Sequence, residues 1–324
     1  MNGIQRLQQA LVERGYGPRL RLNEPLARHT SFAIGGPADL LLVAQTLEEL
    51  QEWVQLAWEL AVPVVVLGEG TNVLVADAGV RGLVVLNACT HFGLEDDGLV
   101  VAQSGVLLRR LARWAVEQGW EGLEWAVGVP GTVGGAVVGN AGAYGGSMAD
   151  NLAWVTLLRP KGKVEKVPVE ALAYGYRTSA LKQETGRRSV VLETALQLKP
   201  GDPAELARRA EQFTVQRRER TPAGCCAGSV FKRTLQYPAG FLIEQAGLKG
   251  RRLGGAEVSP QHANFIMNTG GASAAEVRAL IRIIQDKVWA TFGQHLEPEI
   301  EFIGDWSQTL HSGTGEDKRE HDTT

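Results

Sequence analysis

Three short segments each place a polar side chain that could take part in a reaction among apolar or small neighbours. Arg177 lies in "YGYRTSAL", Ser229 follows a glycine in "CCAGSVFKR", and Glu297 and Glu299 flank a proline in "HLEPEIEFIG". A guanidinium can hold a carboxylate or a phosphate through two parallel hydrogen bonds. Carboxylates two positions apart would face the same side of a strand. Surface ion pairs, turn serines and solvated acids are the ordinary alternatives, so none of these signals identifies a reaction alone.

Two glycine-rich segments could form loops around a ligand. The first, "LGEGTNVLVADAG", permits tight or left-handed backbone at Gly68 and Gly70, and its N–H groups could form an anion-binding concavity. An ordinary strand–turn–strand explains the same residues equally well. The chain has no G-x-x-x-x-G-K-[ST] loop and no G-x-G-x-x-G between a strand and a helix, which disfavours P-loop enzymes and standard Rossmann sites.

The second segment, "GVPGTVGGAVVGNAGAYGG" at 128–146, has eight glycines and no charge. Its proline and asparagine disfavour a membrane helix contact, and its valines disfavour a flexible linker. Because buried backbone N–H and C=O groups need partners, we expect an extended cofactor to supply them. The two segments would then form two walls of one long dinucleotide site, with Gly131, Gly134 and Gly135 letting the backbone approach it.

Bulk composition limits the classes of protein to which the chain could belong. Its 324 residues favour two domains or three, and 44% apolar with 21% charged residues is ordinary for a globular protein. A net charge of −3 argues against general nucleic-acid binding. There is no apolar run long enough for a transmembrane helix. Three cysteines form neither a disulfide framework nor a zinc site, so we expect a cytosolic location.

Hydrophobic periodicity and capping residues predict the elements that must position these side chains. The first 17 residues have an amphipathic helical pattern, and Thr46 with Glu49 begins a helix that Pro63 ends. Asp202 and Pro203 begin another, just after a domain boundary near 200. Further predictions are a short strand near 29–34, strands on both sides of 68–72, a helix at 106–120, a hairpin turning at 160–163, a strand at 189–198, a helix from 273 with a Ser273–Glu276 capping box, and a last strand at 299–304.

Taken in order, these motifs resemble the UDP-N-acetylenolpyruvoylglucosamine reductase family, flavoenzymes that complete UDP-N-acetylmuramate in bacterial wall synthesis. The resemblance extends from about residue 20 to 304. The segments that carry it are "HTSFAIGGPAD", "LGEGTNVLVADAG", "GLEWAVGVPGTVGGAVVGNAGAYGG", "YGYRTSAL", "AGSVFK", "LIEQAGLKGRRLGGAEVS", "HANFIMN" and "LEPEIEFIG".

The resemblance implies an α+β fold with a two-part FAD-binding domain of the vanillyl-alcohol-oxidase (PCMH) type and a smaller α+β substrate-binding domain. We place the first domain at 1–200, with subdomains of about 1–86 and 87–200, the second at 201–304, and a disordered tail at 305–324. It also implies non-covalent FAD, NADPH as the reductant, a nucleotide-sugar substrate and a cytoplasmic enzyme. Nucleic acid, membrane insertion and a metal are not expected.

Residue roles follow from the same motifs. Hydride would pass from FAD to C3 of the enolpyruvyl ether, and Ser229 would protonate C2. Arg177 and Glu299 would stabilise the enolate that forms between these steps, with Glu297 as the alternative to Glu299. The residues expected to bind the cofactor are Gly68, Gly70, Thr71, Asn72, Val73, Leu74, Pro130, Gly131, Gly134, Gly135, Asn140 and Ala141.

The chain departs from the family pattern in places. After the lysine of this motif, Lys232, the family often has asparagine and proline, whereas this chain has Arg233 and Thr234. In addition, only 52 positions separate Arg177 from Ser229. That spacing is similar to a shorter subclass without a substrate-covering tyrosine loop. Cys225 and Cys226, near Ser229, are expected to be small buried hydrophobes.

Two other functions are considered. An oxidase or dehydrogenase of the same flavin fold would not need a nicotinamide, and a non-catalytic nucleotide-binding or assembly protein would be expected to lack one of Arg177, Ser229 and Glu299. All three are present, which favours the reductase.

Overall fold

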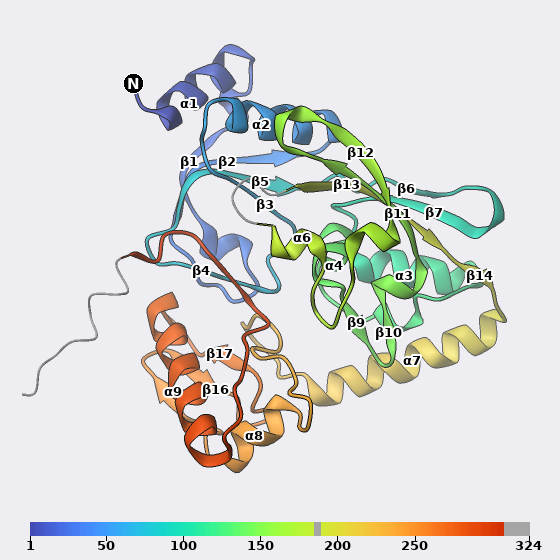
Figure 1. Cartoon of the computed structure of the whole chain (residues 1–324), viewed down its shortest axis with the longest axis vertical. Coiled ribbons are helices and arrows are strands. Elements are labelled where there is room, and N and C mark those ends of the chain that lie inside the picture. The colour runs from blue at the N-terminus through green and yellow to red at the C-terminus, as the bar shows by residue number, and fades with distance from the viewer. Residues whose placement is uncertain (185–188, 308–324) are drawn as a thin grey trace, which may run out of the picture.

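The computed structural model describes residues 1–184 and 189–307. Two β-sheets with their helices form the larger part of the molecule, and a smaller unit containing α8 and α9 lies below them (Figure 1). The mixture of helices and strands confirms the predicted α+β class. The tail predicted to be disordered lies, from residue 308 onward, outside the described residues. No helix within the described ranges is both long and apolar enough to cross a bilayer.

The first sheet has four strands in the order β1-β2-β5-β3, with β1 antiparallel to β2 and the other pairs parallel. Thr46 caps α2 as predicted, since its side chain accepts a hydrogen bond from the Glu49 N–H. The helices α1 and α2 pack on this sheet through a shared core that includes Trp53. The elements are α1 (Gly3–Glu13), η1 (Gly17–Arg19), β1 (Arg21–Pro25), η2 (Leu26–His29), β2 (Pro37–Ala44), α2 (Leu47–Glu59), β3 (Val64–Leu67), β4 (Val73–Val75) and β5 (Val80–Asn87).

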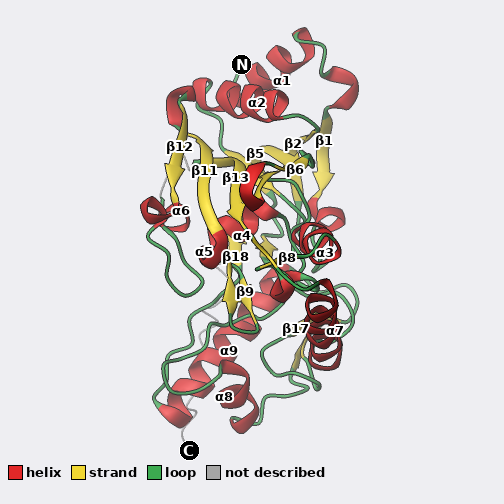
Figure 2. Ribbon diagram, turned by 90° about the vertical axis from the view of Figure 1, so that its right-hand side faces the viewer, coloured by secondary structure: helices red, strands yellow, loops and turns green. Residues whose placement is uncertain are grey.

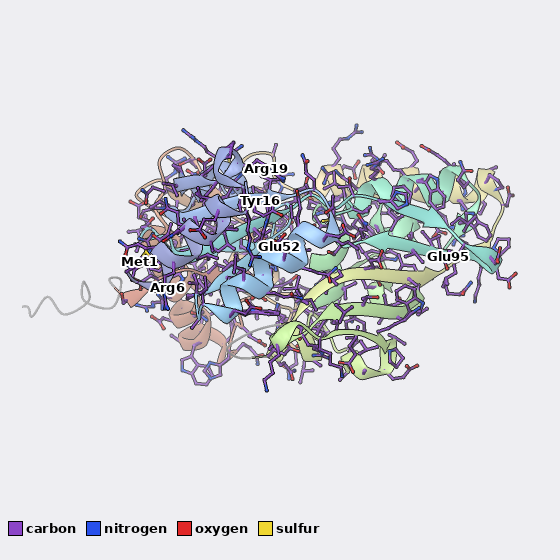
Figure 3. All side chains as sticks on the ribbon, turned by 90° about the horizontal axis from the view of Figure 1, so that it is seen from above. Met1, Arg6, Tyr16, Arg19, Glu52 and Glu95 are labelled. Carbon is purple, nitrogen blue, oxygen red and sulfur yellow. The ribbon has the colours of Figure 1, made fainter. Side chains whose placement is uncertain are left out.

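The segment after α1 is fastened to α2 by polar and aromatic contacts. The Tyr16 hydroxyl donates to Glu52 at 2.6 Å, and its ring meets Trp53 edge-on at 5.0 Å. Arg19 forms an ion pair with Glu49. Figure 3 looks onto this end of the molecule and labels Tyr16, Arg19 and Glu52. These contacts hold α1 and α2 together at the end of the molecule that is far from α8 and α9 (Figure 1).

The short strand predicted near 29–34 is wrong. This stretch follows η2 as an irregular loop, and Ala33 has a left-handed φ of 52° that a strand does not allow. The apolar residues that suggested a strand, Phe32 and Ile34, are buried in the core of the smaller unit instead. Contact with a different unit therefore explains the apolar pattern.

The second sheet is antiparallel throughout, in the order β12-β11-β13-β7-β6. The predicted hairpin is confirmed, because η5 connects β11 to β12. The elements are β6 (Phe92–Leu94), η3 (Asp96–Gly98), β7 (Leu99–Gln103), α3 (Leu108–Glu117), β8 (Trp120–Glu121), η4 (Glu124–Ala126), α4 (Val133–Gly139), β9 (Gly142–Ala143), β10 (Gly146–Ser147), α5 (Met148–Asn151), β11 (Leu152–Leu158), η5 (Pro160–Gly162), β12 (Val164–Pro168), η6 (Val169–Leu172), α6 (Ala180–Gln183) and β13 (Val190–Gln197).

The smaller unit combines a short antiparallel sheet with two helices, and Figure 2 shows it at the lower end of the ribbon. The predicted capping box of α9 is confirmed, with Ser273 and Glu276 each bonded to the other's backbone. Asp77, from the loop after β4, also accepts hydrogen bonds from the first amides of α9. From residue 199 onward, the elements of the chain are β14 (Lys199–Pro200), α7 (Pro203–Arg220), α8 (Ala239–Gln245), β15 (Arg252–Leu253), β16 (Ala256–Val258), β17 (Ile266–Asn268), α9 (Ala274–Phe292) and β18 (Glu301–Ile303).

Two connections cross between the proposed domains. The strand β18 returns to pair in parallel with β4, next to the first sheet. The helix α7 begins at Pro203 with Asp202 as its N-cap, as predicted. Its residues Leu206 and Ala210 are buried in the core of the second sheet. The boundary near 200 stays a prediction, and the helix that follows it packs on the preceding unit.

Candidate active site

Arg177, Ser229 and Glu299 line one cavity of about 400 Å³. Arg177 lies in the loop between η6 and α6, Ser229 lies in the loop after α7, and Glu299 stands two residues before β18. Segments that are far apart in the chain thus bring together the three side chains expected to act on the substrate.

The loop that carries Arg177 is held by the carbonyl groups at the end of α4. Tyr174 donates to Val137 O at 2.8 Å, Ser179 donates to Val138 O at 2.6 Å, and Asn140 donates to the Gly175 carbonyl at 3.0 Å. The last turn of a helix leaves such carbonyls without helical partners. The glycine-rich segment at 128–146 therefore positions the loop of Arg177.

The Arg177 side chain is fixed at both ends of its guanidinium. Nη2 donates to the Gly142 carbonyl at 2.6 Å, and Nε lies 2.9 Å from Glu299 Oε1 as an ion pair that lacks hydrogen-bond geometry. The backbone of Arg177 has a left-handed φ of 56°, which is uncommon for a residue other than glycine. Such strain is typical of sites where the surrounding structure imposes a side-chain direction.

Glu299 and Glu297 have different surroundings. The Glu299 side chain is 15% exposed, whereas that of Glu297 is 70% exposed and pairs with Lys232 at 2.6 Å. Burial raises the pKa of Glu299, and the nearby cations Arg177, Lys182 and Lys232 act in the opposite direction. The strand predicted at 299–304 begins only at residue 301, so neither carboxylate lies on it and the alternation of strand faces does not apply to them.

Ser229 is held through the residues beside it. Gly228 has a left-handed φ of 76°, and the buried Asn264 binds both backbone groups of Phe231 while its own carbonyl accepts from the Val230 N–H. In the described parts of the chain, the Ser229 hydroxyl makes no hydrogen bond with protein. Its position is thus fixed by its neighbours, and its hydroxyl is available to a ligand.

A further cation lies close to Arg177. Arg217, on α7, packs against Gly128 and lies near Tyr144 and Cys226. Burial is the main cause that lowers its pKa, and it forms no ion pair with a carboxylate of the described residues. A half-buried cation without a counter-charge favours an anionic ligand.

Cys225 and Cys226 differ in exposure. Cys225 is exposed and Cys226 is half-buried, so the expectation of two buried hydrophobes is wrong for Cys225. The reason is a β-bridge in which the Cys225 carbonyl accepts from the Asn268 N–H at the surface. Burial raises the pKa of the Cys226 thiol, which disfavours its thiolate.

A second cavity, of about 610 Å³, is lined by Gly68, Thr71 and Pro130 from the predicted cofactor residues. In the part of the chain that is described, the amides at 69–72 donate no hydrogen bond to a protein acceptor. Gly70 has a left-handed φ of 63°, and a Cβ there would lie 2.3 Å from the His29 carbonyl oxygen. Consecutive free amides in such a turn bind anions, so the turn fits the diphosphate of a dinucleotide.

The second glycine segment finds its backbone partners within the protein. The amides of Val133 and Gly134 donate to Val106 and Ser104, and that of Gly135 lies 3.4 Å from Thr132 Oγ1. These three amides therefore do not need the cofactor that we expected to satisfy them, because Val106, Ser104 and Thr132 accept their hydrogen bonds. A Cβ at Gly134 would lie 2.8 Å from Ser104 Cβ.

The remaining predicted cofactor residues contact mainly protein. Val73 and Leu74 are buried in two different cores. Asn72 donates to the Glu299 carbonyl at 3.2 Å, and the Asn140 side chain also accepts from the Ala149 amide. Ala141 packs against the core of the second sheet. Of this group, Asn72 is the one that joins the turn at 69–72 to the cavity of Ser229.

Sequence reasoning missed Glu69 and Arg109. Arg109 Nη1 and Nη2 each donate to a Glu69 oxygen at 2.6 Å, and the Gly131 amide donates to the same carboxylate at 2.7 Å. This carboxylate therefore connects the two glycine segments and α3. The signal was a charged residue between two turn glycines in "GEG", but the sequence does not indicate its partner 40 positions away.

No group of three or more histidine, cysteine, aspartate or glutamate side chains that could hold a metal occurs in the described ranges. Two observations characterise the site: a turn suited to a diphosphate, and a neighbouring cavity with a fixed arginine, a free hydroxyl and a largely buried carboxylate. Ser31 lines the first cavity and donates to the carbonyl of Cys226, in the loop that carries Ser229, at 2.6 Å.

Comparisons with known proteins cover both halves of the chain. The model of an FAD binding domain matches residues 38–168, and that of the UDP-N-acetylenolpyruvoylglucosamine reductase C-terminal domain matches 220–303. The reductase of Rubrobacter xylanophilus is 44% identical over 89% of this chain and 96% of its own, and that of Alkaliphilus oremlandii is 40% identical over 88% and 93%.

Among solved structures, the UDP-N-acetylenolpyruvylglucosamine reductase of Thermus caldophilus superimposes with a TM-score of 0.75. It is 35% identical in sequence, and the match covers 87% of this chain and 99% of that one. These relationships confirm the resemblance found in the motifs and the predicted FAD-binding fold. The chain belongs to the UDP-N-acetylenolpyruvoylglucosamine reductase family, FAD-containing oxidoreductases of peptidoglycan synthesis.

Proposed function

We propose that this protein uses NADPH to reduce the enolpyruvyl ether of UDP-N-acetylglucosamine enolpyruvate to UDP-N-acetylmuramate in the cytoplasm. One observation carries the proposal: Arg177, Ser229 and Glu299 line a single cavity beside a turn with free amides. A nucleotide-sugar substrate and the low cysteine content agree with the cytoplasmic location.

The residues around the first cavity would hold FAD without a covalent bond. The amides of the turn at 69–72 suit its diphosphate, while Pro130 lines the same cavity and the amide of the adjacent Gly131 is bonded to Glu69. When bound, FAD would supply the hydride for C3 of the enolpyruvyl group, with NADPH as its source.

The three cavity residues perform the rest of the reaction. Addition of hydride at C3 leaves a pair of electrons on C2 that is delocalised into the substrate carboxylate. The guanidinium of Arg177, held by Gly142 and Glu299, stabilises that negative charge. The Ser229 hydroxyl then gives its proton to C2, which is basic enough to take it, and solvent restores the proton on Oγ. Glu299 orients Arg177 and, through its raised pKa, can share a proton with the carboxylate.

A single assay separates this function from its alternatives. NADPH oxidation by the purified yellow protein is expected to be slow alone and to accelerate when the enolpyruvyl nucleotide sugar is added, with one NADPH consumed per product formed. An oxidase of the same fold would consume oxygen without NADPH. A non-catalytic protein would bind the nucleotide sugar with no turnover, and a protein that takes up no FAD would overturn the proposal.

Glu69→Gln is expected to weaken FAD binding about tenfold, because the hydrogen bonds that join the two glycine segments lose their ionic character. The hydrogen bond from Arg109 is the main cause that lowers the pKa of Glu69, and it outweighs the burial of this carboxylate, which raises the pKa. Titration of apo-protein with FAD, followed by the loss of flavin fluorescence, measures the affinity. Glu257→Gln removes an ion pair elsewhere, with Arg252, and should leave FAD affinity unchanged. Equal affinity of Glu69→Gln and wild type would show that this contact does not shape the cofactor site.

A further inference from the structure

The segment that carries Glu299 is held by backbone hydrogen bonds on two sides. The Glu299 amide donates to the Val230 carbonyl at 2.7 Å, directly after Ser229. On the other side, the Glu301 amide donates at 2.9 Å to the carbonyl of Asn72, in the turn proposed to bind FAD. The backbone of this segment is therefore fixed relative to both the proton donor and the cofactor site.

The part of the chain that carries Arg177 meets this segment through charged side chains. Arg177 Nε lies 2.9 Å from Glu299 Oε1 but lacks hydrogen-bond geometry. A second ion pair joins the same two parts of the chain, with Lys182 Nζ 3.0 Å from Glu301 Oε1. Because the left-handed backbone of Arg177 is strained, contacts outside its own loop must help to hold it in place.

The ion pair of Lys182 with Glu301 is largely withdrawn from solvent. Its side chains are 18% and 29% exposed. The pair of Lys163 with Glu165 is wider, at 3.4 Å, and its side chains are 68% and 36% exposed. Exposed ion pairs contribute little because water and salt screen them. Of these two pairs, the one at Lys182 is thus the better suited to fix a distance between two segments.

Both ends of this ion pair stand on a backbone that is itself anchored. The Lys182 amide donates to Ser179 Oγ at 3.2 Å, and the same hydroxyl donates to the Val138 carbonyl, at the end of α4, at 2.6 Å. Glu301 is the first residue of β18 and is paired in register with Val73 of β4. A contact between two anchored residues transmits position from one segment to the other.

We propose that the ion pair of Lys182 with Glu301 is a positioning contact for the reaction, which holds the loop of Arg177 against the segment of Glu299 so that both side chains meet the substrate carboxylate together. The inference rests on the proposed function, because the enolate formed by addition of hydride is the species that needs both groups. Lys182 is not among the residues that line the two described cavities, so it acts through Arg177 and Glu299.

Lys182→Met in the holoenzyme is the principal test, because it removes the charge and keeps an apolar side chain of similar length. At saturating nucleotide sugar without oxygen, reoxidation of the reduced flavin should slow about tenfold, since a small displacement of Arg177 costs stabilisation of the enolate. Reduction of the flavin by NADPH, which forms no enolate, should keep the wild-type rate. Stopped-flow absorbance measures both half-reactions.

Two variants make this result specific to the ion pair. Lys182→Arg keeps a cation at the same position and should reoxidise at close to the wild-type rate. Lys163→Met is the matched control, because it removes the same kind of charge from the exposed pair with Glu165, and it should leave both half-reactions unchanged.

A double-mutant cycle tests whether the two residues act as a pair. Glu301→Gln should also slow reoxidation, and the double variant Lys182→Met/Glu301→Gln should lose no more than the larger of the two single losses. Losses that multiply would show that the residues act independently and would overturn the proposal. Glu301→Gln also keeps the test open if Lys182→Met does not fold.

The pH profile of reoxidation gives a readout that a merely structural contact would not move. The cations that face Glu299 are Arg177, Lys182 and Lys232, and each lowers the pKa of Glu299 against the effect of burial. Loss of the charge at Lys182 should therefore raise this pKa further. The apparent pKa that disappears from the profile in Glu299→Gln should move upward in Lys182→Met and stay in place in Lys182→Arg.

Two further results would overturn the proposal. One is reoxidation at the wild-type rate in Lys182→Met, and the other is equal slowing of both half-reactions with an unmoved pH profile. Failure of the proposed function would look different, since the nucleotide sugar would then not reoxidise the reduced flavin of the unaltered protein.

Discussion

Ser229→Ala is expected to lose turnover of the nucleotide sugar by about 10³-fold while NADPH still reduces the bound flavin at the wild-type rate. A positioned general acid typically contributes 10²- to 10⁴-fold. The Ser229 hydroxyl has no hydrogen-bond partner among the described residues, and its backbone neighbours are held by Asn264. Removing Oγ should therefore delete the proton donor without moving the loop. Stopped-flow measurement of flavin reduction and steady-state turnover report the two half-reactions separately.

Two further variants make this result specific. Ser229→Cys keeps a transferable proton and should retain more activity than Ser229→Ala. Cys225→Ala alters an exposed side chain in the same loop and should behave as wild type. If Ser229→Ala turned over at a rate close to wild type, another group would have to protonate C2.

Glu299→Gln and Glu297→Gln form a matched pair in one segment with opposite expected results. Glu299→Gln should lower kcat by at least about 10²-fold, because the carboxylate paired with Arg177 in the cavity is lost. Glu297→Gln removes an exposed pair with Lys232 and should change kcat by less than about twofold. Steady-state kinetics of both variants decide between the residues, and the reverse order would assign the role to Glu297.

The pH dependence of stability gives Glu299→Gln an independent readout. Because the folded-state pKa of Glu299 is raised above its ordinary value of 4.5, the unfolded chain releases this proton first as pH rises. Wild type and Glu299→Gln should therefore be equally stable at low pH. As pH rises from 4.5 through the raised pKa, wild type should lose stability relative to the variant. At still higher pH this difference in stability should stay constant. Thermal unfolding of both proteins across pH measures the difference. A difference that does not vary with pH would contradict the raised pKa.

Local signals in the sequence predicted local structure well. Thr46 and Ser273 cap their helices as expected, and the turn at 160–162 connects its two strands, since partners three to 14 positions apart decide these features. The loop at 29–34 could not be predicted in this way. The apolar residues there pack in a core whose members, apart from Leu74, lie more than 190 positions later.

In the candidate site, too, the sequence indicated individual residues but not the tertiary contacts between them. Arg177, Ser229 and Glu299 were weak signals separately, and only the family resemblance joined them before the structure placed them on one cavity. The contact of Glu69 with Arg109 depends on how α3 packs beside the first glycine turn. Such tertiary contacts leave no periodicity or spacing in the sequence.

The parallel pairing of β18 with β4 affects the order in which the chain can fold during synthesis. Leu74, on β4, shares a core with Phe32 and with residues as late as Ile300. An emerging chain cannot complete this core until almost the last described residue has left the ribosome, which leaves Phe32 and Leu74 uncovered through most of translation. Because contacts of such long sequence separation slow folding and expose apolar surface, this early segment is where a nascent chain would depend most on chaperones.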